Sequence, residues 1–499
     1  MQETRPFRML TIGWELQLIG SLARPIGERT GISFRHGMVG DSRRLPLARG
    51  RCPGQDLVSI SKSAAEPLPL PDFELLASLE AAGVPTVQSM IQGDRVLRHR
   101  SGRESFGYAT LLVGNIRAAI ERYNPDVVLG TFDNLHGALG LAVARSMGIP
   151  WVTMAFTAIP NDLTGFCKGM TPNTLVAIER PLDNTLRRQA EQTMHAVRSR
   201  RQQVLAYRPP SSIPQRARQM LLHARNLSRR VLRSKALGVD SFTYPSARER
   251  VKDVVRRSVN RLFLSANKLL TAPPGDRFAY FPLHMAPESS VDTWAPFYQN
   301  QLGLIAQVSL ALPANLELVV KLHFSDPDNY SRRQLQQLTR LPRVFIAHPE
   351  APGRIFLERA ELVIGIQGTA NLEAALLGKP VLLFGDSPYQ YFPRTERAIR
   401  PDELHGQICR LLEQPTPSEE QIGEAFAAYM SRYLPGRHND WSQPLEPVDL
   451  DRFAACFCAL RSYVSHPVNR ANWYREPPFA KVLTDAAVGN SKLVCREAL

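Results

Sequence analysis

Residues 277–413 alternate five short apolar runs with helical or loop segments, and this alternation limits the available folds more than any other feature of the chain. Such a pattern builds a parallel sheet whose faces are covered by helices. The expected strands of this block lie at 277–282, 316–323, 344–347, 362–365 and 381–384. Because ligands of such sheets bind beyond the carboxyl ends of the strands, the residues that follow each strand are the first candidates for function.

The first 165 residues show the same alternation, with expected strands at 8–13, 32–36, 57–60, 126–130 and 151–155. Amphipathic helices are expected at about 108–123 and 135–147, and each ends at a turn signal, Asn124-Pro125 and Gly148-Ile149-Pro150. Two doubly wound domains in one chain imply a cleft between them. The expected fold class is therefore α/β, with two Rossmann-like domains, 1–165 and 271–413, that face a cleft.

Residues 181–270 differ from both blocks in charge. They contain 20 Lys or Arg and five Asp or Glu, so this segment alone carries a surplus equal to the chain's net charge of +15. Its helical signals lie at 186–207, 213–237 and 247–269, which predicts a basic helical insert. Two interpretations stay open: a solvated face that packs over the interdomain hinge, or a docking surface for anionic lipid headgroups or an acidic polymer. Nucleic acid is disfavoured, because no recognition module, zinc spacing or aromatic-interleaved motif accompanies the charge.

The remaining composition restricts the class of protein. With 499 residues, of which 44% are hydrophobic and 21% charged, the chain is expected to be globular. Its six cysteines form neither a disulfide framework nor a paired metal motif, so a reducing cytoplasm is the expected location. No run approaches the roughly 18 apolar residues of a membrane span, and membrane contact is therefore expected to be peripheral. Residues 414–499 are expected to form C-terminal helices, at about 421–433 and 450–464, and a poorly ordered tail.

The segment 364–380 reads as strand, small-residue turn, helix, glycine stop and strand. Gly368 would let a ligand approach the backbone, and the helix-start amides of Thr369, Ala370 and Asn371 would form an anion site to which the Thr369 hydroxyl adds. Glu373, within the first turns of this helix, could accept hydrogen bonds from a ribose diol. A nucleotide phosphate fits such a turn. The alternative is an ordinary capped helix, which is common in α/β proteins.

Two further strand ends point toward the same edge of the sheet. His284 and Glu288 lie in a proline-flanked loop after the strand at 277–282, and Lys321 and His323 end the strand at 316–323. Alternation along a strand places Lys321 and His323 on one face. A cation and an imidazole beside helix-start amides would neutralise a leaving phosphate. Each histidine taken alone could instead have a purely structural role.

These residues carry a resemblance to a known family. The runs at 280–288 (YFPLHMAPE), 320–323 (VKLH) and 365–385 (GIQGTANLEAALLGKPVLLFG) resemble the capsular polysaccharide biosynthesis family, whose members are glycosyltransferases with the two-domain GT-B fold. Some members transfer Kdo from its CMP-activated form. The resemblance covers residues 278–389, roughly a quarter of the chain. It has two departures: His284 stands where a glutamine is expected, and Phe324 stands where a proline usually follows the histidine.

The resemblance implies a donor site, and the lack of a convincing Asp-x-Asp pair at a strand end favours a reaction without a metal ion or cofactor. The implied donor-binding residues are Glu288, Lys321, His323, Gly368, Thr369 and Glu373, and His284 joins them by position only. The nucleotide sugar would be a substrate rather than a cofactor. Asp326-Pro-Asp328 has the spelling of a metal-binding pair, but its central proline and its loop position favour a turn.

The N-terminal domain would then bind the acceptor and supply the base. Glu15 follows the first strand and Asp133 follows the strand at 126–130, so either carboxylate could face the donor across the cleft. The alternative for Asp133 is a capping role at the helix 135–147. Glu15 could likewise be only an acid favoured by the dipole at a helix start.

Three functions remain open at this point. The first is a cytoplasmic, metal-independent glycosyltransferase that acts on a lipid-linked or surface-polysaccharide acceptor, a glycan or glycolipid, with the basic insert at the inner membrane surface. The second is a nucleotide-sugar 2-epimerase, which needs neither an acceptor nor a membrane. The third is a non-catalytic nucleotide-sugar-binding component of a glycan assembly or export complex.

Overall fold

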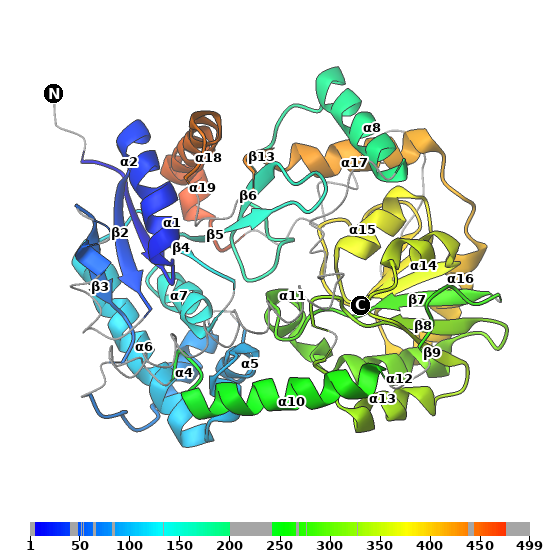
Figure 1. The fold of residues 1–499 in the computed structure, drawn as a ribbon. Coiled ribbons are helices and arrows are strands. Elements are labelled where there is room, and N and C mark those ends of the chain that lie inside the picture. Colours follow the sequence, from blue (N-terminus) through cyan, green and yellow to red (C-terminus); the bar gives the residue numbers. More distant parts are fainter. Residues whose placement is uncertain are drawn as a thin grey trace.

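Two sheets, each covered by helices, lie beside one another in the computed structural model of this chain (Figure 1). The structure describes residues 5–39, 48–50, 52, 54–62, 66–81, 85–132, 134–199, 242–265, 269–275, 277–326, 328–437 and 444–475. Three expectations fall outside these residues: the helix at 213–237, the side chain of Asp133 and the tail beyond residue 475.

The N-terminal sheet has seven strands in the order β13-β6-β5-β4-β1-β2-β3. The strands from β3 to β5 are parallel, whereas β6 is antiparallel to β5 and β13 is antiparallel to β6. The five strands expected in this block are present, with ends that differ by at most two residues; β6 and β13 were not expected. Their bounds are β1 (Arg8–Ile12), β2 (Ser33–Met38), β3 (Asp56–Ser59), β4 (Val127–Gly130), β5 (Trp151–Phe156), β6 (Leu163–Cys167) and β13 (Leu434–Pro435).

The C-terminal sheet has six parallel strands in the order β12-β11-β10-β7-β8-β9. Again the five expected strands are present within two residues at each end, and β12 is additional. In both sheets the chain builds three strands outward in one direction and then returns to the middle to build the other half, which is the Rossmann order and confirms the expected fold class. The bounds are β7 (Phe278–Pro282), β8 (Glu317–Lys321), β9 (Val344–Ala347), β10 (Leu362–Gly365), β11 (Val381–Leu383) and β12 (Thr395–Arg397).

Helices cover both faces of the N-terminal sheet. The longest, α6, begins at a capping box between Ser101 and Glu104 and ends at Asn124, which adopts a left-handed conformation with φ 42°. With α4, α5 and α7 it packs on one face, while η1, α2 and the later helix α18 pack on the other. The bounds are α1 (Leu16–Leu18), η1 (Ile19–Ala23), α2 (Arg24–Thr30), α4 (Phe73–Glu80), α5 (Val87–Gly93), η3 (Leu97–His99), α6 (Gly102–Tyr123) and α7 (Leu135–Ser146).

The C-terminal sheet is covered in the same way. On one face α14, α15, α8 and α17 form one apolar cluster with the strands, and α12, α13 and α16 form another on the opposite face. The bounds are α8 (Asn184–Arg198), α10 (Ala247–Ser265), α11 (Ser289–Asp292), η4 (Pro296–Tyr298), α12 (Gln301–Ala311), α13 (Arg332–Thr339), α14 (Gly353–Arg359), α15 (Thr369–Leu376), η5 (Pro401–Glu403), α16 (Leu404–Glu413), α17 (Glu419–Ser431), α18 (Pro447–Ser465) and α19 (Pro467–Ala471).

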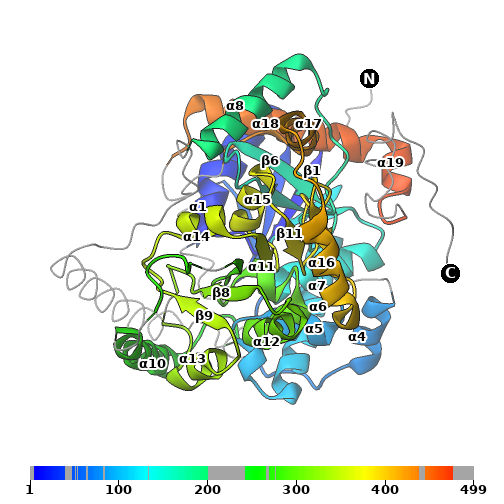
Figure 2. The same cartoon turned by 90° about the vertical axis from the view of Figure 1, so that its right-hand side faces the viewer.

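Two segments cross between the domains. At one end α17 packs against α8, after which β13 joins the N-terminal sheet and α18 packs on α2 (Figures 1 and 2). At the opposite end α10 runs along both domains. The expected helices at 421–433 and 450–464 correspond to α17 and α18, and the basic insert is represented by α8 and α10. Within the described residues, none of the helices combines the length and apolar content that spanning a bilayer requires.

Candidate functional site

The loops after β7 and β10 meet where the strand order of the C-terminal sheet reverses. His284 lies in the first loop, and Gln367 and Gly368 lie in the second. The imidazole packs directly on the glycine, because a Cβ added at Gly368 would lie 3.0 Å from Cε1 of His284. The reversal point of a Rossmann sheet is where nucleotide ligands bind, so this contact lies at the centre of the candidate site.

Both ring nitrogens of His284 are used within the protein. Nε2 accepts a hydrogen bond from the amide of Gln367 (3.4 Å), which assigns the proton to Nδ1. Nδ1 then donates to Oε2 of Glu288 (3.2 Å), and the Ser290 hydroxyl lies equally near. His284 therefore links the loops after β7 and β10. In this arrangement both ring nitrogens have partners within the protein, so neither is available to bind a nucleotide sugar.

The turn into α15 leaves backbone donors without acceptors. The first amide that enters the helical pattern is that of Leu372, which donates to the carbonyl oxygen of Gly368 (3.2 Å). Among the described residues, no acceptor faces the amides of Thr369, Ala370 and Asn371. Residues 368–370 are half-buried rather than sealed under side chains. This helix start can therefore receive phosphate oxygens, as the sequence predicts.

Two buried side chains shape the same turn. The hydroxyl of Tyr389 accepts a hydrogen bond from the Gly368 amide (2.8 Å) and donates to the Gly368 carbonyl oxygen (2.7 Å). Burial raises the pKa of Tyr389 to about 12, so the phenol stays protonated. Asn371 is 1% exposed and packs against Gly365, and its Nδ2 has no hydrogen-bond partner in the described part of the chain. An unpaired buried amide beside free backbone donors favours an acceptor-rich ligand.

Lys321, at the end of β8, is a buried cation that no carboxylate of the described residues pairs with. It is 6% exposed, and its Nζ donates to the carbonyl oxygens of Pro349 (2.8 Å) and Leu322 (3.3 Å). Burial lowers the pKa of Lys321 to about 8. Because neutral carbonyl groups compensate a buried charge only in part, an anion bound near Nζ would favour the charged form.

His323 follows Lys321 at the same sheet edge. Its Nδ1 accepts a hydrogen bond from the amide of Ser325 (3.2 Å), which leaves the proton on Nε2, where it meets no acceptor among the described residues. The ring stacks on Phe324, with centroids 4.7 Å apart. Burial lowers the pKa of His323, and the lowering exceeds the opposing effect of Glu288. A neutral imidazole that donates through Nε2 can hydrogen-bond a phosphate oxygen.

Glu288 links these groups into one cluster. Burial alone would raise its pKa, but the hydrogen bonds from His284 and Ser290, together with His323 nearby, lower it overall. The side chain is 37% exposed. His323 thus lies within electrostatic range of Glu288, His284 and Lys321, and Glu288 within range of His284 and His323.

Glu373, which the sequence assigns to a ribose diol, is engaged with another residue. Its Oε2 pairs with the guanidinium of Arg354 in α14 (3.2 Å). Arg354 also pairs with Glu358 (2.8 Å) and donates to the carbonyl oxygen of Val197 in α8 (3.1 Å). Burial raises the pKa of Glu373, although Arg354 opposes the change. This carboxylate therefore ties α15 to α14 and, through Arg354, to the insert helix α8.

Contacts among the described residues assign no role to either of the two residues proposed for the acceptor side, Glu15 and Asp133. Glu15 is exposed between β1 and α1, and its side chain caps no amide of that helix. The cap of α7 is Asn134, whose Oδ1 accepts a hydrogen bond from the Gly137 amide (3.0 Å). The capping role considered for Asp133 is thus filled by the next residue, a correction, while Asp133 itself lies outside the described residues. His136 is buried, and its Nε2 lies 3.2 Å from the hydroxyl of Tyr108.

Asp292 joins the two domains beside the loop that carries Glu288. One of its oxygens accepts a hydrogen bond from the Glu288 amide (3.1 Å) and pairs with Arg98 of the N-terminal domain (2.9 Å). Phe132, after β4, packs edge-on against Trp294, with centroids 5.1 Å apart. A small pocket, with a volume of about 20 Å³, lies between these parts. Its lining comprises Pro85, Ser89, Met90, Gly93, Asn134, Ala138, Met170, Asp292 and Thr293.

Asp326 and Asp328 do not form an open pair of carboxylates. Both pair with Arg257 of α10, and burial raises the pKa of Asp326 despite this partner. Turn hydrogen bonds at 323–326 and 326–329 agree with the turn expected here. In the part of the chain that the structure describes, no group of three or more His, Cys, Asp or Glu side chains is arranged to hold a metal ion.

Sequence reasoning missed several residues of this region. Tyr389 follows β11 and His348 follows β9, so the rule that favours residues after strand ends could have found both. His348 repeats the arrangement of His323, because its Nδ1 accepts a hydrogen bond from the Glu350 amide (3.2 Å). Arg354 and the side chain of Asn371 had no such signal, since their roles depend on contacts between helices.

Comparisons with known proteins give distant structural likenesses only. No protein-family model matches the chain, and no curated protein matches it. Among solved structures, the glycotransferase of kitacinnamycin is 15% identical, with 92% of this chain and 99% of that chain covered and a TM-score of 0.27. The beta Kdo 2,7 transferase KpsC of Thermosulfurimonas dismutans is 12% identical, with 69% and 89% covered and a TM-score of 0.34.

A third likeness is to the UDP-GlcNAc 2-epimerase of Neisseria meningitidis bound to UDP-GlcNAc, which is 11% identical, with 92% and 100% covered and a TM-score of 0.27. At these TM-scores the alignments establish neither a shared activity nor a shared ligand. The Rossmann order of the two sheets and the geometry of the site stand on the structure of this chain alone.

Proposed function

We propose that this protein is a glycosyltransferase of GT-B type that takes a sugar from a nucleotide-activated donor. One arrangement supports the proposal: the free amides at the start of α15 follow β10 at the reversal point of the C-terminal sheet, and Lys321 and His323 lie at the carboxyl end of β8, the strand beside β7. These are positive or donor groups at the edge of the sheet where Rossmann folds bind nucleotides, and Lys321 pairs with no carboxylate of the described residues. The resemblance of the runs at 280–288, 320–323 and 365–385 to the capsular polysaccharide biosynthesis family supports the same assignment.

The proposed chemistry is electrostatic. As the bond from the sugar to the phosphate breaks, negative charge develops on the departing phosphate, and donors already held in place stabilise it without reorganisation. Lys321 supplies a full charge, His323 supplies the Nε2 proton, and the amides of Thr369 and Ala370 supply the positive end of a helix. Because these groups neutralise the phosphate themselves, the proposed transfer needs no metal ion and should persist in EDTA.

The proposed donor is CMP-Kdo or a related CMP sugar, since the motifs at 280–288, 320–323 and 365–385 resemble a family that includes Kdo transferases. The proposed acceptor is a glycan or glycolipid of the bacterial surface, built at the cytoplasmic face of the inner membrane. The basic insert supports this location by its charge. Glu15 and Asp133 remain the proposed candidates for the acceptor base.

Nucleotide-dependent thermal stabilisation tests the donor site directly. A ligand that binds only the native state raises the melting temperature by mass action, so CMP, UDP, GDP and their sugar conjugates can be ranked in one screen. We expect CMP and CMP sugars to stabilise the wild type, and Lys321→Met to abolish the effect. If no nucleotide stabilises the protein at millimolar concentration, the proposal is wrong.

A transfer assay with the best-binding donor then separates three functions. Sugar transfer to glycolipid extracts or surface-glycan fragments supports the glycosyltransferase. Rapid conversion of the donor alone to its C2 epimer would identify the 2-epimerase instead. Tight nucleotide binding with neither reaction would identify a non-catalytic component of a glycan assembly or export complex.

A further inference from the structure

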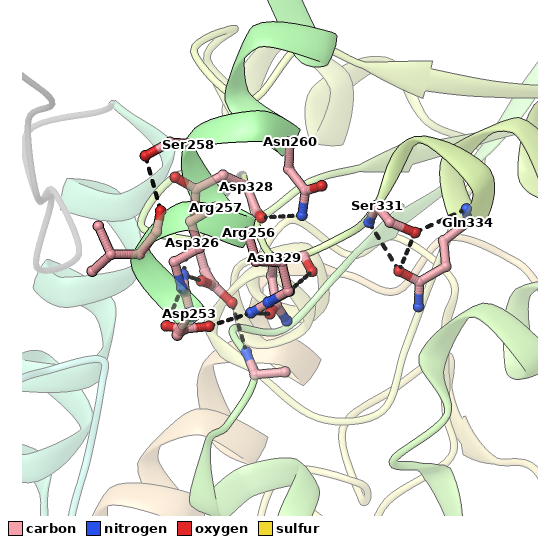
Figure 3. Close-up of polar contacts among 12 residues, drawn as sticks. Asp253, Arg256, Arg257, Ser258, Asn260, Asp326, Asp328, Asn329, Ser331 and Gln334 are labelled. Carbon is pink, nitrogen blue, oxygen red and sulfur yellow. Dashed lines mark hydrogen bonds and ion pairs between the residues drawn. The ribbon is translucent and has the colours of Figure 1, made fainter. Parts of the chain in front are cut away.

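Helix α10 turns its polar side toward the protein. Figure 3 shows Arg257 reaching Asp326 and Asp328, and Asn260 donating to the carbonyl oxygen of Asp328 (2.9 Å). Asp253 adds ion pairs to Arg257 (2.9 Å) and Arg256 (2.6 Å) along the same helix. An amphipathic helix of a globular protein normally buries its apolar stripe and exposes its charges. In α10 the inward contacts are mostly polar.

The outward side of α10 is apolar. Val251, Val254, Val255 and Val259 recur at helical spacing, and their exposed fractions are 51%, 48%, 57% and 60%. At about 100° per residue these four side chains form one stripe along the helix. Single exposed valines are ordinary, but four on one face of one helix form a continuous apolar surface. We call these four residues the valine stripe.

Basic side chains border the valine stripe. Arg248 and Lys252 are exposed, and neither pairs with a carboxylate among the described residues. Across α10 as a whole there are six Lys or Arg against two acids, Glu249 and Asp253, and Asp253 is already paired on the inward side. A partner of this surface must therefore offer an apolar interior together with negative charge at its margins.

Contacts at both ends hold α10 in place. In the segment that leads into α10 the ring of Phe242 stacks on Tyr108 of α6, with centroids 5.1 Å apart, and Glu249 in the first turn pairs with Arg100 (3.4 Å). Toward its end Arg257 and Leu264 bind it to the C-terminal domain. The valine stripe thus lies along a helix supported by both domains (Figure 1).

We propose that the valine stripe docks the protein on an anionic lipid bilayer, with α10 parallel to the membrane plane. Helices that lie at the membrane interface combine a moderately apolar face with Lys and Arg at its borders, because the apolar side chains enter the acyl boundary while the cations reach the headgroups. The basic residues beside the valine stripe favour an anionic bilayer over a neutral apolar groove of another protein, because only the bilayer offers negative charge to them. This proposal rests on the proposed function in one respect: a glycolipid acceptor would lie in the same membrane.

Vesicle sedimentation with the full chain tests the docking surface. Vesicles of phosphatidylcholine with phosphatidylglycerol provide the anionic surface, and vesicles of phosphatidylcholine alone provide the neutral one. We expect binding to the anionic vesicles that falls with added salt, and a partition coefficient at least about ten-fold lower for the triple variant Val251→Ser, Val255→Ser, Val259→Ser. The charge variant Lys252→Glu should also weaken binding, by about five-fold.

The matched control is Val468→Ser in α19, since Val468 is 59% exposed but lies outside the valine stripe. It should bind as the wild type does. Absence of binding to anionic vesicles, or equal binding by the triple variant, overturns the proposal. Crosslinking of Val255→Cys to the chain's own residues 200–241 in the absence of vesicles also overturns it, because the stripe would then be covered within the molecule.

Nucleotide stabilisation of the triple variant separates this proposal from the proposed function. The valine stripe contributes no group to the donor site, so the triple variant should keep the CMP-dependent rise in melting temperature while losing vesicle binding. Vesicle binding without any nucleotide effect would support the docking surface and contradict the proposed glycosyltransferase function.

Discussion

Arg257 of α10 pairs with Asp326, and the second oxygen of Asp326 accepts a hydrogen bond from the amide of Ala286 (3.2 Å) in the loop that carries His284 and Glu288. The insert helix is therefore connected to the donor-side loop through one carboxylate. Asp326 is 5% exposed, so its charge depends on these partners rather than on water. The contact gives α10 a role in holding the candidate site as well as a surface of its own.

Replacement of Arg257 by methionine should destabilise the protein by about 2 to 3 kcal/mol, because it leaves a buried carboxylate without its cation. Urea unfolding at pH 7 measures this loss. The control is Arg256→Met, whose side chain is 45% exposed and pairs with Asp253, and it should cost less than about 1 kcal/mol. Equal losses of stability in the two variants would show that the ion pair between Arg257 and Asp326 stabilises the protein no more than an exposed pair does.

Nucleotide binding should weaken as the pH rises above about 8. Burial lowers the pKa of Lys321 to about 8 in the free protein, so the ammonium loses its proton through this range and with it the attraction for phosphate. We expect the dissociation constant to rise by up to about ten-fold from pH 7 to pH 9, with proton uptake on binding near pH 8. Titration calorimetry in two buffers of different ionisation enthalpy measures both effects.

The control for this pH profile is Lys321→Arg, because a guanidinium keeps its charge throughout the range. Its nucleotide affinity should be nearly independent of pH between 7 and 9. A flat profile in the wild type would mean that Lys321 does not contact the phosphate.

Lys321→Met should separate stability from function. A buried ammonium with a lowered pKa costs stability at pH 7, so methionine should raise the free energy of unfolding by about 1 kcal/mol, even after the hydrogen bonds to Pro349 and Leu322 are lost. The unfolded chain binds more protons than the native state between pH 8 and the ordinary pKa of lysine, so the wild type recovers stability there and the gain shrinks. Urea unfolding of the wild type and of Lys321→Met at pH 7 and pH 9 measures the difference in stability at each pH. A variant less stable than the wild type at pH 7 contradicts the argument.

Gly368→Ala should damage the donor site. The new Cβ would lie 3.0 Å from Cε1 and 3.4 Å from Nε2 of His284, so the ring must move and its hydrogen bond with Gln367 must weaken. We expect a loss of about 1 to 2 kcal/mol in stability and a nucleotide affinity at least about ten-fold lower. The control is Gly114→Ala in the middle of α6, where a Cβ meets nothing within 4 Å. It should stabilise the protein by up to about 1 kcal/mol without changing nucleotide binding.

Glu15→Ala and Asp133→Ala test the acceptor base. If one of these carboxylates accepts the proton of the acceptor hydroxyl, its removal should lower sugar transfer by about 100-fold or more and leave nucleotide binding unchanged. Parallel assays of transfer and of donor hydrolysis distinguish a base from a donor-binding residue. Full transfer in both variants would remove the two residues from the mechanism.

Local pattern was sufficient for most strands. The runs that became β9 and β10 were predicted with the observed ends, because a buried parallel strand needs a short apolar run between turn signals and nothing from elsewhere in the chain. The strands that were missed depend on distant partners. β13 has only two residues and exists because the chain returns after α17 to pair with β6.

The candidate site divides in the same way. The free amides at the α15 turn follow from the order of strand, glycine and helix, which is local. The role of His284 does not, because its Nε2 meets the Gln367 amide only when β7 and β10 lie side by side. Glu373 was assigned to a ribose from its helical position, whereas its partner Arg354 comes from a different helix.

Helix α10 shows where local information ends. The heptad-like spacing of its valines and arginines predicts an amphipathic helix, since that property depends only on residues three or four apart. Which side turns inward was settled by Asp326 and Asp328, which lie about seventy residues away in sequence and need a buried cation. Secondary structure is thus encoded by neighbours along the chain, whereas the orientation of a helix and the partners of a buried charge depend on groups that only the folded chain brings together.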